Sequence, residues 1–225
     1  LVSWGRNIYG QLGDGSTEDS RVPVGVGTGY ASVNLGTRHT CAVKTNGDLE
    51  CWGSNNYGQL GNGENVDSNV PVAIGSGYAS VALGEGHTCA LKLNGDLECW
   101  GRNGFERRLG NGSNVDSNVP VSIGSGYANV SAGVSHTCAV KVGGDLECWG
   151  GNGRGQIGNG SLTGGSVPIS TIGSGSYANV SAGSWHTCAL KVGGAIECWG
   201  DNHSGQLGDG SLRNWTPHFV SPAIP

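Results

Sequence analysis

The sequence lacks methionine altogether and is poor in charged residues. Charged residues make up 13% of its 225 residues, and the net charge at pH 7 is −5, whereas globular proteins usually carry about 25% charged residues. A chain with a pI near 5.6 does not have the basic character of a nucleic-acid binder, so we expect no nucleic-acid partner. The absence of methionine indicates a processed product or a part of a longer protein.

Long apolar runs are also missing. No run approaches the roughly 18 apolar residues of a membrane-spanning helix, and no signal peptide is recognisable, so we expect no membrane insertion. Glycine supplies 44 residues, and each interior glycine costs a helix about 1 kcal/mol relative to alanine. With 7 prolines and no Gly-X-Y period the chain is not collagen, and 7 tryptophans and 6 tyrosines argue against disorder. What remains is a turn-rich, all-β protein.

A repeat organises the whole chain. Trp-Gly pairs recur at spacings of 48, 48, 49 and 50 residues, with their tryptophans at Trp4, Trp52, Trp100, Trp149 and Trp199. A second block, His-Thr-Cys-Ala, begins at His39, His87, His136 and His186. A unit of this length fits a propeller blade of four short strands. We therefore predict an all-β, single-domain β-propeller with a leading half-blade over 1–29 and blades over 30–77, 78–126, 127–176 and 177–225.

The strands can be placed within a unit. Residues 79–83 form a short first strand, and residues 87–93 and 96–101 flank an Asn94-Gly95 turn as a hairpin. The fourth strand of the preceding unit covers residues 70–74, where Pro71 is tolerable because this strand lies at a sheet edge. The Gly- and Asn-rich stretch 54–69 is expected to be a loop.

The cysteines pair within the repeat. They occur as Cys41/Cys51, Cys89/Cys99, Cys138/Cys148 and Cys188/Cys198, each pair ten positions apart. A three-residue hairpin loop centred on Asn46, with Gly47 in the left-handed position, places the first two cysteines directly opposite each other. Directly opposed residues have Cα atoms about 4.5 to 5.5 Å apart, within disulfide reach. We predict one disulfide inside each hairpin.

Two alternatives to disulfides remain for these cysteines. A histidine two residues before each first cysteine suggests metal binding, although the fourth ligand would be missing in every blade and zinc prefers closer Cys-x-x-Cys spacing. Reduced, buried thiols are the other alternative. Because disulfides persist in oxidising compartments, we expect a secreted or cell-surface protein.

The pattern Gly-x-x-His-Thr-Cys-Ala-Leu-Lys, Gly-Asp-Leu-Glu-Cys-Trp-Gly, Gly-Gln-Leu-Gly-Asn-Gly resembles the regulator of chromosome condensation repeat family. The likeness covers nearly the full chain, four times over. It implies a β-propeller, most often of seven blades, and functions as different as nucleotide exchange on a small GTPase, chromatin binding and inhibition of a secreted hydrolase. The four and a half units of this sequence depart from that blade number.

Several motifs have structural interpretations that outweigh functional ones. The Gly-x-Gly-x-x-Gly spelled by residues 153–158 is not followed by a helix that could receive a phosphate, so we expect no nucleotide cofactor. The repeated histidines accompany no consistent nucleophile and carboxylate, so we expect them to bond to backbone inside each blade, and we expect no enzyme. Asp67 and Asp116 could offer oxygens to calcium, but turn formation explains them better, and we expect no metal.

The repeats disagree mainly in two loops of each blade, which in a four-stranded blade emerge on the same face. We call this the varied face, and its third long loop has one extra residue and a charged run in place of Gly-Gln. Rigid folds present binding residues on such loops, although unconstrained drift would produce the same variation. The candidate binding residues are Arg38, Glu85, Phe105, Arg107, Arg108, Trp185 and His203.

We therefore expect a non-catalytic, secreted binding or assembly module whose partner is a protein or another copy of itself. The alternatives are an exchange factor for a small GTPase, a carbohydrate-binding propeller and an inhibitor of an enzyme. The half-blade over 1–29 lacks two strands, and exposed strand edges pair readily with other chains. We expect it to dock on another copy, forming an oligomer or a filament, rather than to close against the last blade of its own chain.

Overall fold

The computed structural model describes residues 1–173, 175–212 and 215–220, the last six in their backbone only. Its strands form one two-stranded and four four-stranded antiparallel sheets. The first sheet contains β1 (Val2–Gly5) and β2 (Ser20–Gly25), and the second contains β3 (Tyr30–Leu35), β4 (His39–Lys44), β5 (Leu49–Gly53) and β6 (Ser68–Gly75). The third contains β7 (Tyr78–Leu83), β8 (His87–Lys92), β9 (Leu97–Gly101) and β10 (Ser117–Gly124). The fourth contains β11 (Tyr127–Ala132), β12 (His136–Lys141), β13 (Leu146–Gly150) and β14 (Gly165–Ser170), and the fifth contains β15 (Tyr177–Ala182), β16 (His186–Lys191), β17 (Ile196–Asp201) and β18 (Trp215–Val220).

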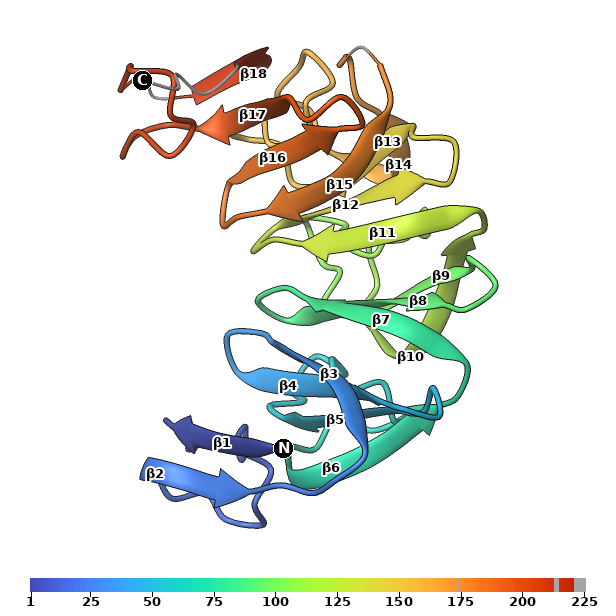
Figure 1. Ribbon diagram of the computed structural model, residues 1–225, viewed down its shortest axis with the longest axis vertical. Coiled ribbons are helices and arrows are strands. Elements are labelled where there is room, and N and C mark those ends of the chain that lie inside the picture. The colour runs from blue at the N-terminus through green and yellow to red at the C-terminus, as the bar shows by residue number, and fades with distance from the viewer. Residues whose placement is uncertain (174, 213–214, 221–225) are drawn as a thin grey trace.

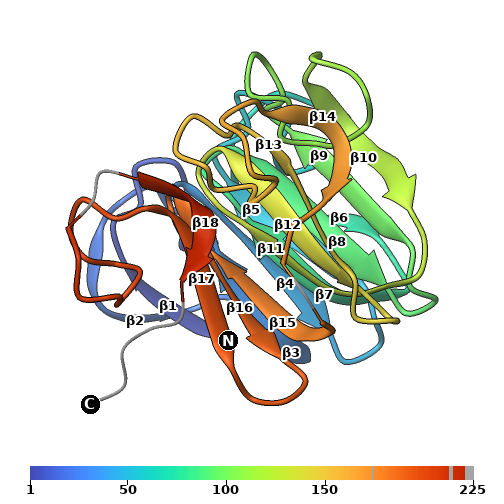
Figure 2. The same cartoon turned by 90° about the horizontal axis from the view of Figure 1, so that it is seen from above.

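This architecture confirms the predicted four blades and leading half-blade. Within each four-stranded sheet the strands pair in sequence order, so every blade is a simple meander. The blades are stacked along the long axis of the molecule, and the first strands β3, β7, β11 and β15 follow one another along one side of the stack (Figure 1). Seen along that axis, the sheets fan out one behind the other (Figure 2). No described helix is long and apolar enough to cross a membrane.

The hairpin between the second and third strands has the predicted register. Cys41 lies opposite Cys51 and Val43 opposite Leu49, and the same offset recurs in the other three blades. All four predicted disulfides are present, with Cα–Cα distances of 4.0 to 4.1 Å. Neither metal ligation nor free thiols therefore describe these cysteines, since every one of them is bonded to its opposite neighbour.

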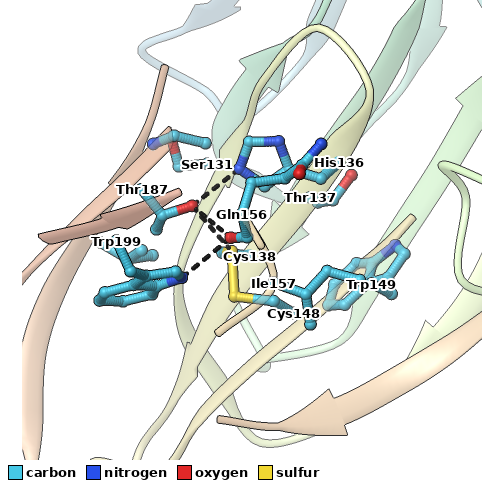
Figure 3. Close-up of a disulfide and its surroundings, with 12 residues drawn as sticks. Ser131, His136, Thr137, Cys138, Cys148, Trp149, Gln156, Ile157, Thr187 and Trp199 are labelled. Carbon is cyan, nitrogen blue, oxygen red and sulfur yellow. Dashed lines mark hydrogen bonds between the residues drawn. A yellow bond between two sulfur atoms is a disulfide. The ribbon is translucent and has the colours of Figure 1, made fainter. Parts of the chain in front are cut away.

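The bridge of the fourth sheet shows where these disulfides lie (Figure 3). Cys138 on β12 is bonded to Cys148 on β13, with 4.1 Å between their Cα atoms. This distance is shorter than the separation of about 4.5 to 5.5 Å predicted for opposed residues. Cys148 is 0% exposed, as are Cys138 and the cysteines of the two preceding blades. Cys148 and its counterparts in the two preceding blades are therefore structural residues in the core between blades.

The core lies between blades rather than within them. In one junction, Cys41, Val43 and Leu49 of one blade pack against Tyr78 and Trp100 of the next. The repeated tryptophans Trp52, Trp100, Trp149 and Trp199 are all 0% exposed, as expected for side chains that pack between blades. Burying a side chain of this size contributes several kcal/mol by the area it removes from water. The stacking of blades, more than any single blade, therefore stabilises the fold.

A hydrogen-bonded chain crosses each interior junction, and Figure 3 shows the one between the fourth and fifth sheets. Thr187 Oγ1 and Trp199 Nε1 both donate to the carbonyl oxygen of Gln156, at 2.8 and 2.9 Å. His136 Nε2 lies 2.8 Å from the same Thr187 hydroxyl. The Thr187 hydroxyl already donates its only proton to this carbonyl, so it can only accept a hydrogen bond from His136. The proton of the neutral His136 ring therefore lies on Nε2. The partner of the histidine is thus a threonine of the next blade, not the backbone that we predicted.

The other two interior junctions repeat this arrangement with His39, Thr88, Gln59 and Trp100, and with His87, Thr137, Arg108 and Trp149. Burial in these junctions lowers the pKa of His39 and of His136 to about 3 and depresses the pKa of His87 strongly. The Nδ1 atoms of all three have no hydrogen-bond partner among the described residues, so a second ring proton would have no acceptor. These histidines are neutral structural groups.

The two ends of the stack do not meet. The half-blade of β1 and β2 and the blade of β15–β18 lie at opposite ends of the long axis (Figure 1). Surfaces that are buried in the interior junctions are consequently uncovered here: Trp4 is 62% exposed and Leu35 is 74% exposed at one end, and Leu190 and Ile196 are 39% and 46% exposed at the other. Among the described residues, the first sheet and the last do not pair to close a ring.

Candidate protein-binding face

An asparagine anchors every long loop of the varied face. Asn55 Oδ1 accepts a hydrogen bond from the Leu60 backbone amide at 2.9 Å, and its Nδ2 donates across the loop to the Glu64 carbonyl at 2.9 Å. The equivalent asparagines are Asn7, Asn103, Asn152 and Asn202, each at most 2% exposed. A buried side chain that satisfies backbone groups on both limbs of a loop holds the loop in one shape. The variable residues therefore stand on a fixed base.

Acidic residues of these loops also accept hydrogen bonds from backbone amides and so help to hold the loops in shape. Asp67 Oδ1 accepts from the Asn55 amide at 2.6 Å, and Asp116 Oδ1 accepts from the Asn103 amide at 2.7 Å. The turn-forming role predicted for both aspartates is confirmed. Among the described residues, no group of three or more His, Cys, Asp or Glu side chains is arranged to hold a metal ion.

The opposite face of the propeller, which we call the uniform face, repeats one cluster in each complete blade. Tyr78 Oη donates to Glu98 at 2.8 Å, Lys92 Nζ lies 2.9 Å from the same carboxylate, and the ammonium sits 5.4 Å from the tyrosine ring centre. Burial, followed by the hydrogen bond to Glu98, raises the pKa of Tyr78. The other blades repeat this with Lys44, Glu50 and Tyr30, with Lys141, Glu147 and Tyr127, and with Lys191, Glu197 and Tyr177. All four lysines of the chain are thus already paired.

Arginines replace lysines on the varied face. The exposed Arg38 lies over the ring of Tyr9, with 5.3 Å between its guanidinium carbon and the ring centre. Arg102 lies 4.8 Å over Tyr57 and 3.6 Å from the Glu85 carboxylate. Each stack joins two adjacent blades and holds a planar cation at the surface. Two of the predicted residues, Arg38 and Glu85, are therefore positioned by neighbours that the sequence did not single out.

The third long loop is the most distinctive part of this face. Phe105 at its tip is 95% exposed. Arg107 has φ of 57°, and it takes the place of the repeat glycines Gly10, Gly58, Gly155 and Gly205, whose φ values are 75° or 76°. A non-glycine residue in this region stores on the order of 1 kcal/mol of strain. The third long loop therefore keeps a left-handed residue at this position, and it carries the side chain of Arg107 where the other loops have glycine.

Arg108 does not belong with the exposed residues, which corrects its place in the sequence-based site. It stands where the other repeats have glutamine, it is 5% exposed, and its Nε donates to the Val134 carbonyl at 3.1 Å. The backbone carbonyl oxygen of Arg108 accepts hydrogen bonds from Thr137 Oγ1 and Trp149 Nε1 in the junction. Arg108 supports the loop from below, and its side chain is not available to a partner.

The remaining candidates lie at the C-terminal end of the face. Trp185 is 47% exposed. The His203 ring lies 2.6 Å from Asp201, which also accepts from Gln206 at 2.6 Å. The sequence-predicted set is thus uneven along the stack: four of its seven residues belong to the blade over 78–126, one to the blade over 30–77 and two to the last blade. Its aromatic and arginine members offer a broad contact surface and no catalytic constellation.

Sequence reasoning missed the loop asparagines and the two stacking tyrosines. Asparagine stands two residues after the Trp-Gly glycine in all five units, at positions 7, 55, 103, 152 and 202, and this invariance could have identified the anchors. Tyr9 and Tyr57 lie in the first two long loops of the varied face, but their pairing with arginines depends on contacts between blades. No spacing within one repeat reveals such contacts.

Comparison with known proteins places this geometry in a family. Two sequence profiles described as the Regulator of chromosome condensation (RCC1) repeat match the chain, one over residues 2–43 and 46–91 and the other over residues 30–59, 78–106, 127–156 and 177–206. Among curated proteins, the ultraviolet-B receptor UVR8 of Arabidopsis thaliana is 49% identical over 53 residues, which is 22% of this chain and 12% of UVR8.

Solved structures support the same fold. Human WBSCR16 superposes with a TM-score of 0.87 at 22% identity, over 100% of this chain and 62% of its own. Prp20p from Saccharomyces cerevisiae, described with its binding properties to Gsp1p and histones, gives a TM-score of 0.81 at 20% identity, over 92% of this chain and 54% of its own. The chain thus spans only part of the length of these relatives. With its repeats, its blades and these matches in agreement, the chain belongs to the regulator of chromosome condensation repeat family.

Proposed function

We propose that this chain is a non-catalytic binding module that engages a protein partner through its varied face. The observation that carries the proposal is the contrast between the two faces. On the uniform face, the lysines and glutamates pair with each other in Lys–Glu–Tyr clusters. On the varied face, Phe105, Trp185, Arg38 and Arg107 are exposed on anchored loops. Aromatic and arginine side chains dominate the energetics of protein interfaces. Rigid loops also reduce the entropy that is lost on binding.

Substitutions on the two faces test this function. Phe105→Ala combined with Trp185→Ala removes the two large exposed aromatic rings of the varied face. Leu93→Ala combined with Val142→Ala is the matched control, since both residues are more than 70% exposed in turns of the uniform face. After a partner is captured with the wild-type protein, purified components should show at least a tenfold loss of affinity for the first pair and no change for the second. Equal affinities for all three proteins would overturn the proposal.

The proposed site of action is an oxidising compartment, outside the cell or on its surface. Four disulfides in a chain without free cysteines support it. Alkylation of the protein taken directly from its natural source, followed by mass measurement, should leave all eight cysteines unmodified. Modification of most cysteines would place the protein in a reducing compartment.

Self-association through the open ends is a second candidate function. The uncovered interblade surfaces favour it, because a hollow of 440 Å³ remains beside the half-blade, lined by Trp4, Leu35 and Trp52 among others. We propose that the last blade of one copy covers the first end of the next. Sedimentation should then reveal an oligomer or filament that Ile196→Lys dissociates and Leu93→Lys leaves intact. A monodisperse monomer at high concentration would remove this candidate.

Nucleotide exchange is the main rival, because the family includes exchange factors. It predicts that the protein accelerates release of a fluorescent guanine nucleotide from a small GTPase. If the protein only binds its partner, the nucleotide should be released at its uncatalysed rate. The same assay therefore separates the two functions whether or not a GTPase binds.

A further inference from the structure

A hollow of 370 Å³ opens on the varied face beside the third long loop. Phe105, Glu106 and Arg107 line it from one blade, and Gly151 and Leu162 line it from the next. Only this repeat has glycine at the position of Gly151, since the other four have Arg6, Ser54, Arg102 and Asp201. A Cβ atom added to Gly151 would overlap the Glu106 carboxylate. The missing side chain is what gives Glu106 room to reach across the junction.

Glu106 differs from the other acidic side chains around it. Glu85 pairs with Arg102, and Asp201 is bonded by His203 and Gln206. Glu106 is half-buried, and within the part of the chain that the structure describes it makes no hydrogen bond and no ion pair, although the buried Arg108 guanidinium attracts it from a greater distance. A carboxylate that has lost part of its hydration without gaining a donor is complementary to a cation.

The walls of the hollow define what should carry that cation. Phe105 is 95% exposed and Leu162 is 41% exposed, so both offer apolar surface beside the carboxylate. An aliphatic stem that ends in a cation fits this combination, because its methylene groups cover apolar surface while the charged head reaches a polar group. An aromatic ring at the rim favours a cationic head as well. Lysine and arginine side chains have this chemistry.

We infer that the hollow is the anchor site for one lysine or arginine side chain of the protein partner, whose cation pairs with Glu106 and whose stem packs on Phe105 and Leu162. The inference rests on the proposed protein-binding function and names the group that is recognised. Arg107 also lines the hollow, and its positive charge opposes the incoming cation. Removing that charge should therefore strengthen the binding of a small cationic probe in the hollow, and this direction can be checked.

Small probes test the site without knowledge of the partner. The amide signals of Gly151, Gly153 and Gly164, which all line the hollow, can be followed by NMR during titration with N-acetyl-lysine methylamide and N-acetyl-arginine methylamide. Norleucine and citrulline analogues are the neutral counterparts. We expect saturable shifts with at least one cationic probe and none with its neutral counterpart, and the comparison of the two cations decides between lysine and arginine.

Three variants make the test specific. Glu106→Gln should weaken the cationic probe at least tenfold, whereas Glu64→Gln, on an exposed outer loop, should change nothing. Arg107→Gly should bind more tightly and should fold well, because glycine is the repeat residue at this φ. Unchanged affinity in Glu106→Gln would overturn the inference, as would shifts of these glycines by methyl glucoside, which would make the hollow a sugar site.

The failure of this inference is distinguishable from the failure of the proposed function. If partner binding requires Phe105 and Trp185 but is the same for Glu106→Gln and wild type, the varied face binds a protein without a cationic anchor in this hollow. If the aromatic pair is dispensable while the cationic probe binds through Glu106, the hollow is a small-cation site and the broader interface is absent.

Discussion

The interior junctions and the open ends of the stack present the same repeat surface in two environments. Leu91 is 6% exposed inside a junction, whereas Leu190, at the same repeat position, is 39% exposed at the C-terminal end. Trp100 is fully buried, whereas Trp4 is 62% exposed. The side chains are nearly the same, so the neighbouring blade supplies the difference. In proteins built from repeats, much of the stability resides in the interfaces between neighbours.

This difference should be largest for the repeated tryptophans. Trp100→Ala should lower the free energy of unfolding by about 3–5 kcal/mol, because it empties a packed junction and removes a donor to the Gln59 carbonyl. Trp4→Ala should change it by less than about 0.5 kcal/mol, as expected for an exposed side chain. Urea unfolding measures both. Similar costs at the two positions would mean that the first end is covered in solution.

The disulfides of the interior junctions should likewise differ from the disulfide at the open C-terminal end. Replacing Cys89 and Cys99 by serine should cost about 2–3 kcal/mol, the value expected when a short loop is no longer closed. Under mild reduction the Cys188–Cys198 bridge should open first, because Cys188 is half-buried and the six cysteines of the other three bridges are all 0% exposed. Alkylation at timed intervals, read by peptide mass mapping, gives the order. Simultaneous opening of all four would contradict the distinction.

Acid should destabilise the interior junctions next. The folded-state pKa of His39 and of His136 is about 3, below the usual 6.5. The unfolded chain therefore binds more protons as the pH falls below 6.5, and stability is lost towards the folded pKa. From pH 7 to pH 5 each interior histidine should cost about 2 kcal/mol. The unfolding midpoints at the two pH values should differ less in His136→Gln than in wild type. Because His186 is only half-buried, His186→Gln should reduce this difference by a smaller amount.

The smallest expected effect is at the open C-terminal end. Leu190→Lys should alter stability by less than about 0.5 kcal/mol, since the lysine head can reach water. Leu91→Lys, its interior equivalent, should unfold the protein or lower its melting temperature steeply, because it buries an unpaired charge. Thermal unfolding compares them directly. A large cost at Leu190 would indicate that another copy covers this surface.

Local patterns in the sequence were sufficient for most of the fold. The opposed cysteines and the glycine at position 47 set the hairpin register, and the Trp-Gly spacing set the number of blades. The predicted strand at 79–83 is found as β7 with one additional residue at its start. These features are local and are repeated four times, so one error of register would have been visible against three correct copies.

The candidate site was less predictable, because its geometry arises between blades. Nothing near Arg108 in the sequence indicates that its guanidinium turns inward to the Val134 carbonyl of the next blade. The room for the Glu106 carboxylate likewise depends on a glycine 45 positions further along, at Gly151. Loop variation directed attention to one face of the propeller, but it could not separate residues that support a loop from residues that face outward.

The hairpin disulfides have a consequence for the protein under tension. Each bridge joins cysteines ten positions apart whose Cα atoms are about 4.1 Å apart. A fully extended residue spans about 3.4 Å, so each intact bridge withholds roughly 30 Å of chain length from a molecule pulled by its two ends. An oxidised chain would therefore stop extending well short of a reduced one, and its maximum length would change in four equal steps as the bridges open one by one.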